Sequence, residues 1–272
     1  MPTSINTRKL SYNSAKLLRD SVRDAATNTS PVLYVTLGNS VPYNNEASPD
    51  NIVDTINTEK AAFENIFAGK KVTGNDIELV IPKVNWTGST KYRQYDDIID
   101  VEDLVTAIPA LNLKPMYVIT SARNVYKCLS NSASANSTVE PTGDYTTSNG
   151  NIATADGYIW KYMYTVTTAK ALKFLTNDYM SVQKLDSDDG TDQWDVQAAA
   201  VDGGIHVVKV TSGGSGYGSA PAVTITGDGT GATANSTIVA NTVTAVVITA
   251  AGTGYTRASV AFASGAAAAT AI

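Results

Sequence analysis

The stretch "DGYIWKYMYTV" (residues 156–166) carries an aromatic residue at every second position: Tyr158, Trp160, Tyr162 and Tyr164. Because successive side chains of a β-strand point to opposite faces, this spacing predicts a strand with all four rings on one face. Such a face can be a ligand platform, a domain core or a surface for another protein. A platform for bases normally lies beside basic residues, whereas this chain has a net charge of −5. We therefore expect the rings to pack in a core or a subunit interface.

The composition is that of a globular protein rich in strands and turns. Only 17% of the 272 residues are charged, and Thr, Ser, Asn, Ala and Gly are abundant. No long basic run is present, so we expect no nucleic-acid partner. No segment approaches the ~20 apolar residues of a spanning helix, and the first residues lack the apolar core of a signal peptide. We therefore expect synthesis in a cytoplasm and no membrane partner. The single cysteine, Cys128, cannot form an internal disulfide.

Periodicity and turn residues predict a mainly β fold with a few helices (α+β). Helices are expected over residues 11–26 and 49–68. Strands are expected within residues 31–43, 77–86, 113–131 (two strands) and 156–166, with a long loop over 132–155. The acidic, turn-forming stretch at 184–193 predicts a domain boundary. We thus expect a mixed N-terminal domain over residues 1–190 and a β-repeat domain over residues 191–272.

The C-terminal region contains two copies of a glycine-rich unit. Gly214-Ser215-Gly216-Tyr217 returns as Gly252-Thr253-Gly254-Tyr255, 38 positions later. In each copy one strand is expected before the turn (207–210 and 246–248) and one after it (222–225 and 260–262), followed by a Gly/Ala tail. Two such copies can bury each other's apolar faces, with Tyr217 and Tyr255 as candidate buried rings.

Signals of enzymatic chemistry are weak. The single histidine, His206, adjoins a predicted strand and is expected to be structural, and Cys128 is expected to be a small buried side chain. The glycine run at 213–218 lacks the spacing of a dinucleotide fingerprint and the aspartate of a calcium-binding repeat. The acidic run at 186–192 does not have the spacing of an EF-hand. We expect no catalytic residue, no metal site and no cofactor.

Five segments resemble, in the same order, the baseplate wedge protein of contractile-tailed, T4-like bacteriophages. They are "VLYVTLGNSVPYNNEASPDN" (32–51), "ELVIPKVNWTGSTKYRQYD" (78–96), "VYKCLSN" (125–131), "STVEPTGDY" (137–145) and "DGYIWKYMYTV" (156–166). The resemblance covers about residues 30–185. It implies a mostly β, dimeric structural protein of the virion, without enzymatic activity. Such a protein lies in the wedges of the tail baseplate and contacts other wedge and tail proteins.

The aromatic residues are the candidates for the core or for an interface with these partners. They are Trp86, Tyr92, Tyr95, Tyr158, Trp160, Tyr162, Tyr164, Tyr217 and Tyr255. The C-terminal repeats depart from the family pattern, so three alternatives stay open. The chain could be a neck or tail accessory protein, a carbohydrate- or receptor-binding module of the tail, or a hydrolase of cell-wall polymer. The last would use a carboxylate pair chosen from Glu140, Asp144 and Asp156.

Overall fold

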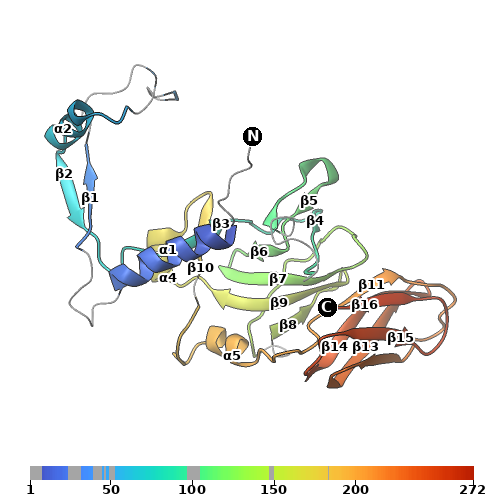
Figure 1. The fold of residues 1–272 in the computed structure, drawn as a ribbon. Helices are drawn as coiled ribbons and strands as arrows, with labels where there is room; N and C mark the ends of the chain where they lie inside the picture. Colours follow the sequence, from blue (N-terminus) through green and yellow to red (C-terminus); the bar gives the residue numbers. More distant parts are fainter. Residues whose placement is uncertain are drawn as a thin grey trace. The chain divides into compact units, whose positions relative to one another are not determined.

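The computed structural model describes residues 8–23, 32–38, 45, 47–48, 53–96, 105–146, 150–182 and 184–272. The chain forms two compact units (Figure 1). Unit 1 comprises Met1–Ile81 and Ser181–Gln183, and unit 2 comprises Pro82–Met180 and Lys184–Ile272. The fold is mainly β, with 38% strand and 18% helix, which agrees with the fold class expected from the sequence.

Unit 1 contains a long helix, a two-stranded ribbon with a short helix, and strand β3. The elements are α1 (Arg8–Arg23), β1 (Tyr34–Leu37), α2 (Ile56–Glu64), β2 (Ala68–Lys71) and β3 (Leu79–Pro82). β1 and β2 are antiparallel, and β3 pairs with β10 (Tyr179–Val182). Both helices were predicted, although residues 24–31 and 49–52 lie outside the described residues.

Helix α2 is shorter than the sequence predicts. The Thr55 side chain caps its first turn by accepting a hydrogen bond from the Thr58 N–H, and Asn65 ends it. Ile66 and Phe67, which belong to the helix predicted over residues 49–68, therefore lie beyond its end. Gly69, the residue after the predicted helix, lies inside β2.

The aromatic stretch forms an inner strand of a four-stranded antiparallel sheet in unit 2. The strand order is β6-β7-β9-β8, and the strands span β6 (Tyr117–Ile119), β7 (Asn124–Asn131), β8 (Asn151–Ala153) and β9 (Tyr158–Thr165). The strands expected within 113–131 and 156–166 are thus confirmed. The long loop expected over 132–155 is wrong at its end, because Ile152 of β8 pairs with Trp160 of β9.

Several short elements of unit 2 were not predicted as separate elements; of these, only β5 (Leu113–Lys114) lies within a predicted strand region, 113–131. A parallel pair is formed by β4 (Lys91–Tyr92) and β5, next to a 3-10 helix, η1 (Pro109–Leu111). Two helices of seven residues follow the sheet, α4 (Thr168–Phe174) and α5 (Asp192–Ala198). The Thr167 side chain accepts a hydrogen bond from Lys170 N and caps α4.

The C-terminal residues form a six-stranded antiparallel sheet that nearly closes on itself (Figure 1, orange and red). Its order is β12-β15-β16-β11-β14-β13, and an isolated bridge between Ala222 and Asn235 joins the two outer strands. The strands are β11 (Val208–Ser212), β12 (Val223–Gly227), β13 (Thr230–Val239), β14 (Thr242–Thr253), β15 (Ala258–Phe262) and β16 (Ala268–Ala271).

The two sequence copies pair with each other in a symmetric pattern, in which each strand of one copy makes the same pairings as its equivalent in the other. β11 pairs with β14 and β12 with β15, so equivalent strands of the two copies meet. The third strand of each copy pairs with the first strand of the other, β13 with β14 and β16 with β11. The expected Gly/Ala tails are therefore wrong as tails, because the chain uses them as β13 and β16. Each copy supplies the neighbour that the other copy's first strand needs.

Candidate interaction surfaces

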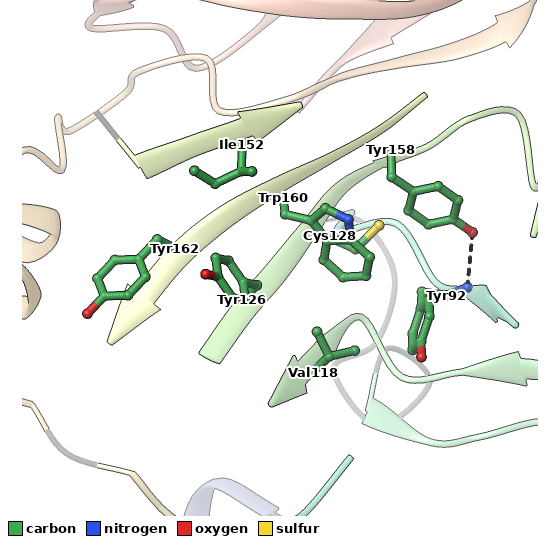
Figure 2. Close-up of a cluster of buried hydrophobic side chains, with 8 residues drawn as sticks. All are labelled: Tyr92, Val118, Tyr126, Cys128, Ile152, Tyr158, Trp160 and Tyr162. Atoms are coloured by element: carbon green, nitrogen blue, oxygen red, sulfur yellow. Dashed lines mark hydrogen bonds between the residues drawn. The ribbon is translucent and has the colours of Figure 1, made fainter. Parts of the chain in front are cut away.

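The aromatic face of β9 is the core of the four-stranded sheet. Tyr158 and Trp160 are fully buried and Tyr162 is 3% exposed (Figure 2). The Trp160 ring stacks on Tyr158, with centroids 5.4 Å apart, and meets Tyr92 edge to face at 5.3 Å. Offset stacks and edge-to-face pairs are the favoured geometries of aromatic side chains. Tyr126, Cys128, Val118 and Ile152 complete this cluster.

The polar ends of these rings are bonded to backbone groups. The Tyr158 hydroxyl donates to the Ala135 carbonyl (2.6 Å) and accepts from the Tyr92 N–H (3.3 Å), and the Tyr126 hydroxyl donates to the Gly143 carbonyl. Burial raises the pKa of the Tyr158 hydroxyl far above its ordinary value. Among the described residues, the Trp160 Nε1–H has no hydrogen-bond acceptor. The rings of Tyr158, Trp160 and Tyr162 are therefore too buried to form a flat, solvent-open platform for a sugar or a base.

The other candidates near this core are only partly covered. Tyr164, the last aromatic residue of β9, is half-buried. Trp86 packs against the cluster, and its Nε1–H donates to the Ser137 hydroxyl (3.2 Å). Tyr95 is half-buried beside the second sheet, where its ring meets His206 edge to face at 5.7 Å.

Tyr217 and Tyr255 occupy matching places in the six-stranded sheet. The Tyr217 hydroxyl accepts the Ala267 N–H (3.1 Å) and the Tyr255 hydroxyl accepts the Ala232 N–H (3.4 Å). Each ring lies against a glycine of the other copy. A Cβ on Gly265 would come within 2.4 Å of the Tyr217 hydroxyl, and one on Gly227 within 3.0 Å of Tyr255 Cδ1. Glycine is needed at both places because the ring fills the space of a side chain.

A cationic cluster lies where the two sheets of unit 2 pack together. Lys127 Nζ lies 2.8 Å from His206 Nε2 and 4.0 Å from the centroid of the Tyr95 ring. Desolvation and the charges of Lys127 and Lys161 lower the pKa of His206 to about 4, and desolvation and Lys161 lower the pKa of Lys127 to about 8. Within the described ranges, no carboxylate forms an ion pair with Lys127 or His206, and a carboxylate that orients the imidazole is part of the usual general-base arrangement. Apolar contacts among Leu129, Ile159, Val207 and Ala245 surround the cluster.

The remaining titratable candidates have structural roles. Cys128 is fully buried, and desolvation raises the pKa of its thiol, which is unlike a reactive cysteine. Asp156 accepts hydrogen bonds from the N–H groups of Thr138 and Val139 and so fixes the loop after β7. The Glu140 carboxylate accepts the Ser121 N–H.

The described residues contain no group of three or more His, Cys, Asp or Glu side chains placed to hold a metal ion. In the acidic run, Asp188 and Asp189 accept hydrogen bonds from Gly190 and Thr191 and form a turn. Within the described part of the chain, no helix has the length and apolar character needed to cross a membrane. The sequence predicts a turn-forming stretch at the acidic run, and the hydrogen bonds of Asp188 and Asp189 form a turn there.

Unit 1 exposes apolar side chains that a folded chain usually buries. We call one group the β1–α2 surface; its side chains are 37% to 73% exposed and belong to Val32, Tyr34, Val35, Leu37, Val53, Ile56, Phe63, Ile66 and Phe67. Helix α1 adds four more, Leu10, Tyr12, Leu17 and Leu18. Large exposed apolar surfaces mark sites of protein–protein or membrane interaction. The sequence predicts the helices and the strand that carry these side chains, but their exposure is visible only in the structure.

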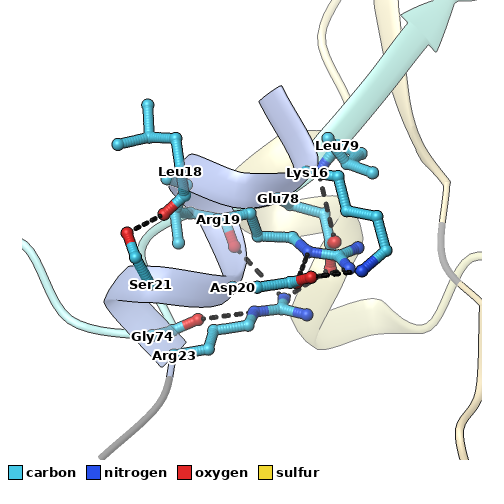
Figure 3. A network of polar contacts seen from close by, with 10 residues as sticks. Lys16, Leu18, Arg19, Asp20, Ser21, Arg23, Gly74, Glu78 and Leu79 are labelled. Carbon is cyan, nitrogen blue, oxygen red and sulfur yellow. Dashed lines mark hydrogen bonds and ion pairs between the residues drawn. The ribbon is translucent and has the colours of Figure 1, made fainter. Parts of the chain in front are cut away.

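Helix α1 is held at its C-terminal end by Arg23. The Arg23 guanidinium donates to the carbonyls of Gly74 and Ile77 (both 3.2 Å) and forms an ion pair with Glu78 (3.1 Å) (Figure 3). Lys16 and Arg19 pair with Asp20 on the same helix. Polar contacts thus fix the helix, while the side chains of Leu17 and Leu18 stay exposed.

Comparison with known proteins gives one family match. Residues 128–199 match the family model described as Phage-Gp8, Gp8 of bacteriophage T4. The match runs from β7 through the aromatic strand β9 to the residue after α5, and residues 128 to 199 inclusive are 72 of the 272. The comparison with curated proteins gave no match. The family match supports a structural protein of a T4-like phage baseplate, located in the virion tail and interacting with other baseplate proteins.

Proposed function

We propose that this chain is a wedge component of a contractile-tail baseplate and that its function is assembly through protein–protein contacts. The observation that carries the proposal is the family match over residues 128–199, which falls on the strands that build the aromatic core. Because the matched residues include core strands, the family match reflects the fold of this part of unit 2 rather than the sequence of a single surface loop. The family is a structural one, and this supports a role without catalysis.

The distribution of apolar surface supports the same function. Tyr158 and Trp160 are buried in the core, whereas the β1–α2 surface and the apolar side of α1 are exposed. Permanent assemblies bury large, fairly apolar areas, and Tyr and Phe side chains at such surfaces carry much of the binding energy. A chain that keeps its apolar groups on the outside of one unit is suited to bind other proteins permanently.

The proposal is tested by assembly with the other baseplate proteins encoded in the same phage genome. The tagged chain is co-expressed with them, purified, and its complexes are identified by mass spectrometry and sized by sedimentation. We expect a stoichiometric complex with at least one baseplate protein. In parallel, tails from phage that lack this gene are expected to show no complete baseplate by electron microscopy. A chain that binds none of these proteins, together with complete baseplates in its absence, would show that the proposal is wrong.

The alternative of a carbohydrate- or receptor-binding module would need aromatic rings that are open to solvent and coplanar. In β9 the rings that could form such a platform are those of Tyr158, Trp160 and Tyr162, and all three are buried. The hydrolase alternative would need a free carboxylate pair, but Glu140 and Asp156 hold backbone N–H groups. Neither alternative is favoured by a specific observation, so we retain the assembly role.

A further inference from the structure

We propose that the junction between the two sheets of unit 2 binds a small inorganic oxyanion such as phosphate or sulfate. Four side chains surround the site: Lys127, Lys161, Asn151 and His206. The bound ion would place a negative charge between the four-stranded and the six-stranded sheet and would help to hold them together. This inference goes beyond the assembly function and does not depend on it, because its test uses the purified chain alone.

The first observation is a row of polar side chains across the four-stranded sheet. Lys127 of β7 lies opposite Lys161 of β9, and Asn151 of β8 lies opposite Lys161 on the other side. The residues that alternate with them belong to the aromatic core, so this row points to the opposite face, which the six-stranded sheet covers. Like charges directly opposite each other on neighbouring strands destabilise a sheet. An anion placed beside Lys127 and Lys161 would reduce this repulsion.

The second observation is that Lys127 has a ring nitrogen and an aromatic face as partners but no anion. Its Nζ lies 2.8 Å from His206 Nε2 and 4.0 Å from the centroid of the Tyr95 ring. An ammonium group is a donor only, so Nε2 accepts from it and the neutral imidazole carries its proton on Nδ1. In the part of the chain that the structure describes, no oxygen atom accepts a hydrogen bond from Lys127. Buried charges are normally paired, and an oxyanion would supply the partner for Lys127.

The third observation is a small hollow next to these groups. Its polar lining comes from Ser130, Asn151 and His206, and the remaining lining is aliphatic. Lys127 is bonded to His206 and Lys161 lies opposite Asn151, so both lysines adjoin the hollow. His206 stays accessible to solvent, which gives an ion a way in. The Ser130 hydroxyl and the Asn151 amide can donate hydrogen bonds to an oxyanion, and the aliphatic walls strengthen these bonds by excluding water.

The pKa values of the cluster support a site for a negative charge. Desolvation and the charge of Lys161 lower the pKa of Lys127 to about 8. Desolvation and the charges of both lysines lower the pKa of His206 to about 4, and desolvation also lowers the pKa of Lys161. Each shift means that the surroundings disfavour the positively charged form. An anion bound among these groups should therefore raise all three pKa values.

The neighbouring ion pair does not take the place of such an anion. Lys209 of β11 forms an ion pair with Asp96 (2.8 Å), the residue that follows Tyr95. The two charges of this pair cancel, and the pKa of Lys127 responds to burial and to Lys161 rather than to Asp96. The titratable and charged groups around Lys127 are thus Lys161 on β9, His206 before β11, Tyr95, and the Asp96–Lys209 pair.

Binding of the oxyanion should be coupled to the uptake of a proton. Without the ion, Nε2 of His206 accepts from the Lys127 ammonium and stays unprotonated at neutral pH. If the oxyanion accepts from Lys127 instead, Nε2 is released and can take a proton from the solvent. The imidazolium then donates to the same ion, so the chain with the ion bound should have a higher His206 pKa.

The first test follows the pKa of His206 by NMR in the purified full chain without a histidine tag. His206 is the single histidine of the sequence, so its imidazole gives one signal to titrate. The titration is run in sodium chloride and in sodium sulfate of equal ionic strength, which keeps general screening the same. We expect sulfate to raise the pKa by about one unit or more, which means about tenfold tighter binding to the protonated form.

Two variants show whether the effect belongs to this site. Lys127→Gln removes the ammonium and keeps a polar side chain, so sulfate should no longer raise the pKa of His206. Lys184→Gln is the matched control, because it removes the same charge from an exposed lysine that does not line the hollow. This control should respond to sulfate as the natural chain does.

The second test measures sulfate binding by isothermal titration calorimetry near neutral pH. We expect Lys127→Gln to weaken binding roughly tenfold or more. Asn151→Ala is a second variant that keeps both lysines, and it should weaken binding severalfold through the loss of an amide donor. In the natural chain the affinity should fall as the pH rises through about 8, since Lys127 loses its proton there. Circular dichroism spectra check that each variant is folded.

A His206 pKa that is the same in sulfate and in chloride would overturn the anion site. So would a rise of equal size in Lys127→Gln, or a sulfate affinity that neither Lys127→Gln nor Asn151→Ala changes. These results are independent of the baseplate function, which is tested by complex formation. A chain that binds sulfate here but joins no baseplate complex would support the site and contradict only the assembly function.

Discussion

Replacing Trp160 with alanine tests whether the aromatic strand is the core on which the four-stranded sheet depends. Trp160 is fully buried on β9, between β7 and β8. Its indole stacks on Tyr158 and meets Tyr92 edge to face. The substitution removes both ring contacts and leaves a cavity at the centre of the cluster shown in Figure 2.

The size of the effect follows from these contacts. Large-to-small substitutions of buried Trp or Phe cost about 3–5 kcal/mol, and each aromatic pair contributes about 0.5–1.5 kcal/mol beyond its buried area. Trp160 Nε1–H, however, has no acceptor among the described residues, and removing a buried unpaired donor returns about 1–3 kcal/mol. We therefore expect Trp160→Ala to lower the free energy of unfolding by about 3–4 kcal/mol. Trp160→Phe, which keeps a ring and loses the donor, should cost about 1 kcal/mol or less.

The assay is urea unfolding followed by far-ultraviolet circular dichroism at one fixed protein concentration. A loss of ~3–4 kcal/mol lowers the midpoint by roughly 1–2 M when the slope is ~2–3 kcal/mol per molar. Leu172→Ala is the control, because Leu172 is 84% exposed and surface substitutions stay within about 0.5 kcal/mol. If Trp160→Ala costs less than ~1 kcal/mol, or no more than Leu172→Ala, the rings of β9 are not the core and the argument is wrong.

Three further predictions concern individual side chains. Folding lowers the pKa of His206 to about 4. Between about pH 6.5 and pH 4 the unfolded chain therefore binds a proton that the folded chain does not, so stability should fall as the pH drops through this window. Melting temperatures measured at several pH values should show this fall, and His206→Gln should reduce it. Partial burial raises the pKa of Asp156, but hydrogen bonds from Thr154 and from the Thr138 and Val139 N–H groups lower it overall. Asp156→Ala should cost about 2 kcal/mol of unfolding free energy at neutral pH. In the natural chain, the contribution of this carboxylate to stability should disappear when an acid titration passes through the lowered pKa. Gly265 has a φ of +78°, and a Cβ there would overlap the Tyr217 ring, so Gly265→Ala should destabilise the six-stranded sheet by at least ~2 kcal/mol. Gly216 has a similar φ but open space around it, so Gly216→Ala should cost only ~1 kcal/mol. Equal thermal shifts for the two variants would contradict the ring-packing argument.

The strands that form the core could be predicted because their pattern is local. Alternation along residues 156–166 gives both the strand and the side that the rings share. The end of α2 could not be predicted in this way. Ile66 and Phe67 follow Phe63 at helical spacing, and no Pro or Gly separates them, so the apolar stripe extends past the helix. Asn65 ends the helix as its C-cap, and asparagine is a weak stop signal in sequence.

The third strands of the two C-terminal copies were missed for a different reason. β16 is the segment "AATA" (268–271), and alanine has low strand propensity. It forms a strand because it lies between β11 and β15, whose backbone groups it satisfies. The turn between β13 and β14 is equally inconspicuous, because Ala240 and Asn241 both have positive φ without a glycine. Tertiary pairing decides both elements, and a single sequence does not contain it in readable form.

The two units differ in how completely they bury their apolar side chains, and the exposed ones in unit 1 form the β1–α2 surface. In unit 2 the rings of Tyr158, Trp160 and Tyr162 are buried, and the six-stranded sheet nearly closes. In unit 1 the two-stranded ribbon β1–β2 is exposed on both faces, and an isolated two-stranded ribbon is marginally stable in water. A ribbon of this kind gains stability when further strands or helices cover it. Because β1 and α2 together present exposed apolar residues, binding to another protein in the proposed assembly role would also stabilise the ribbon.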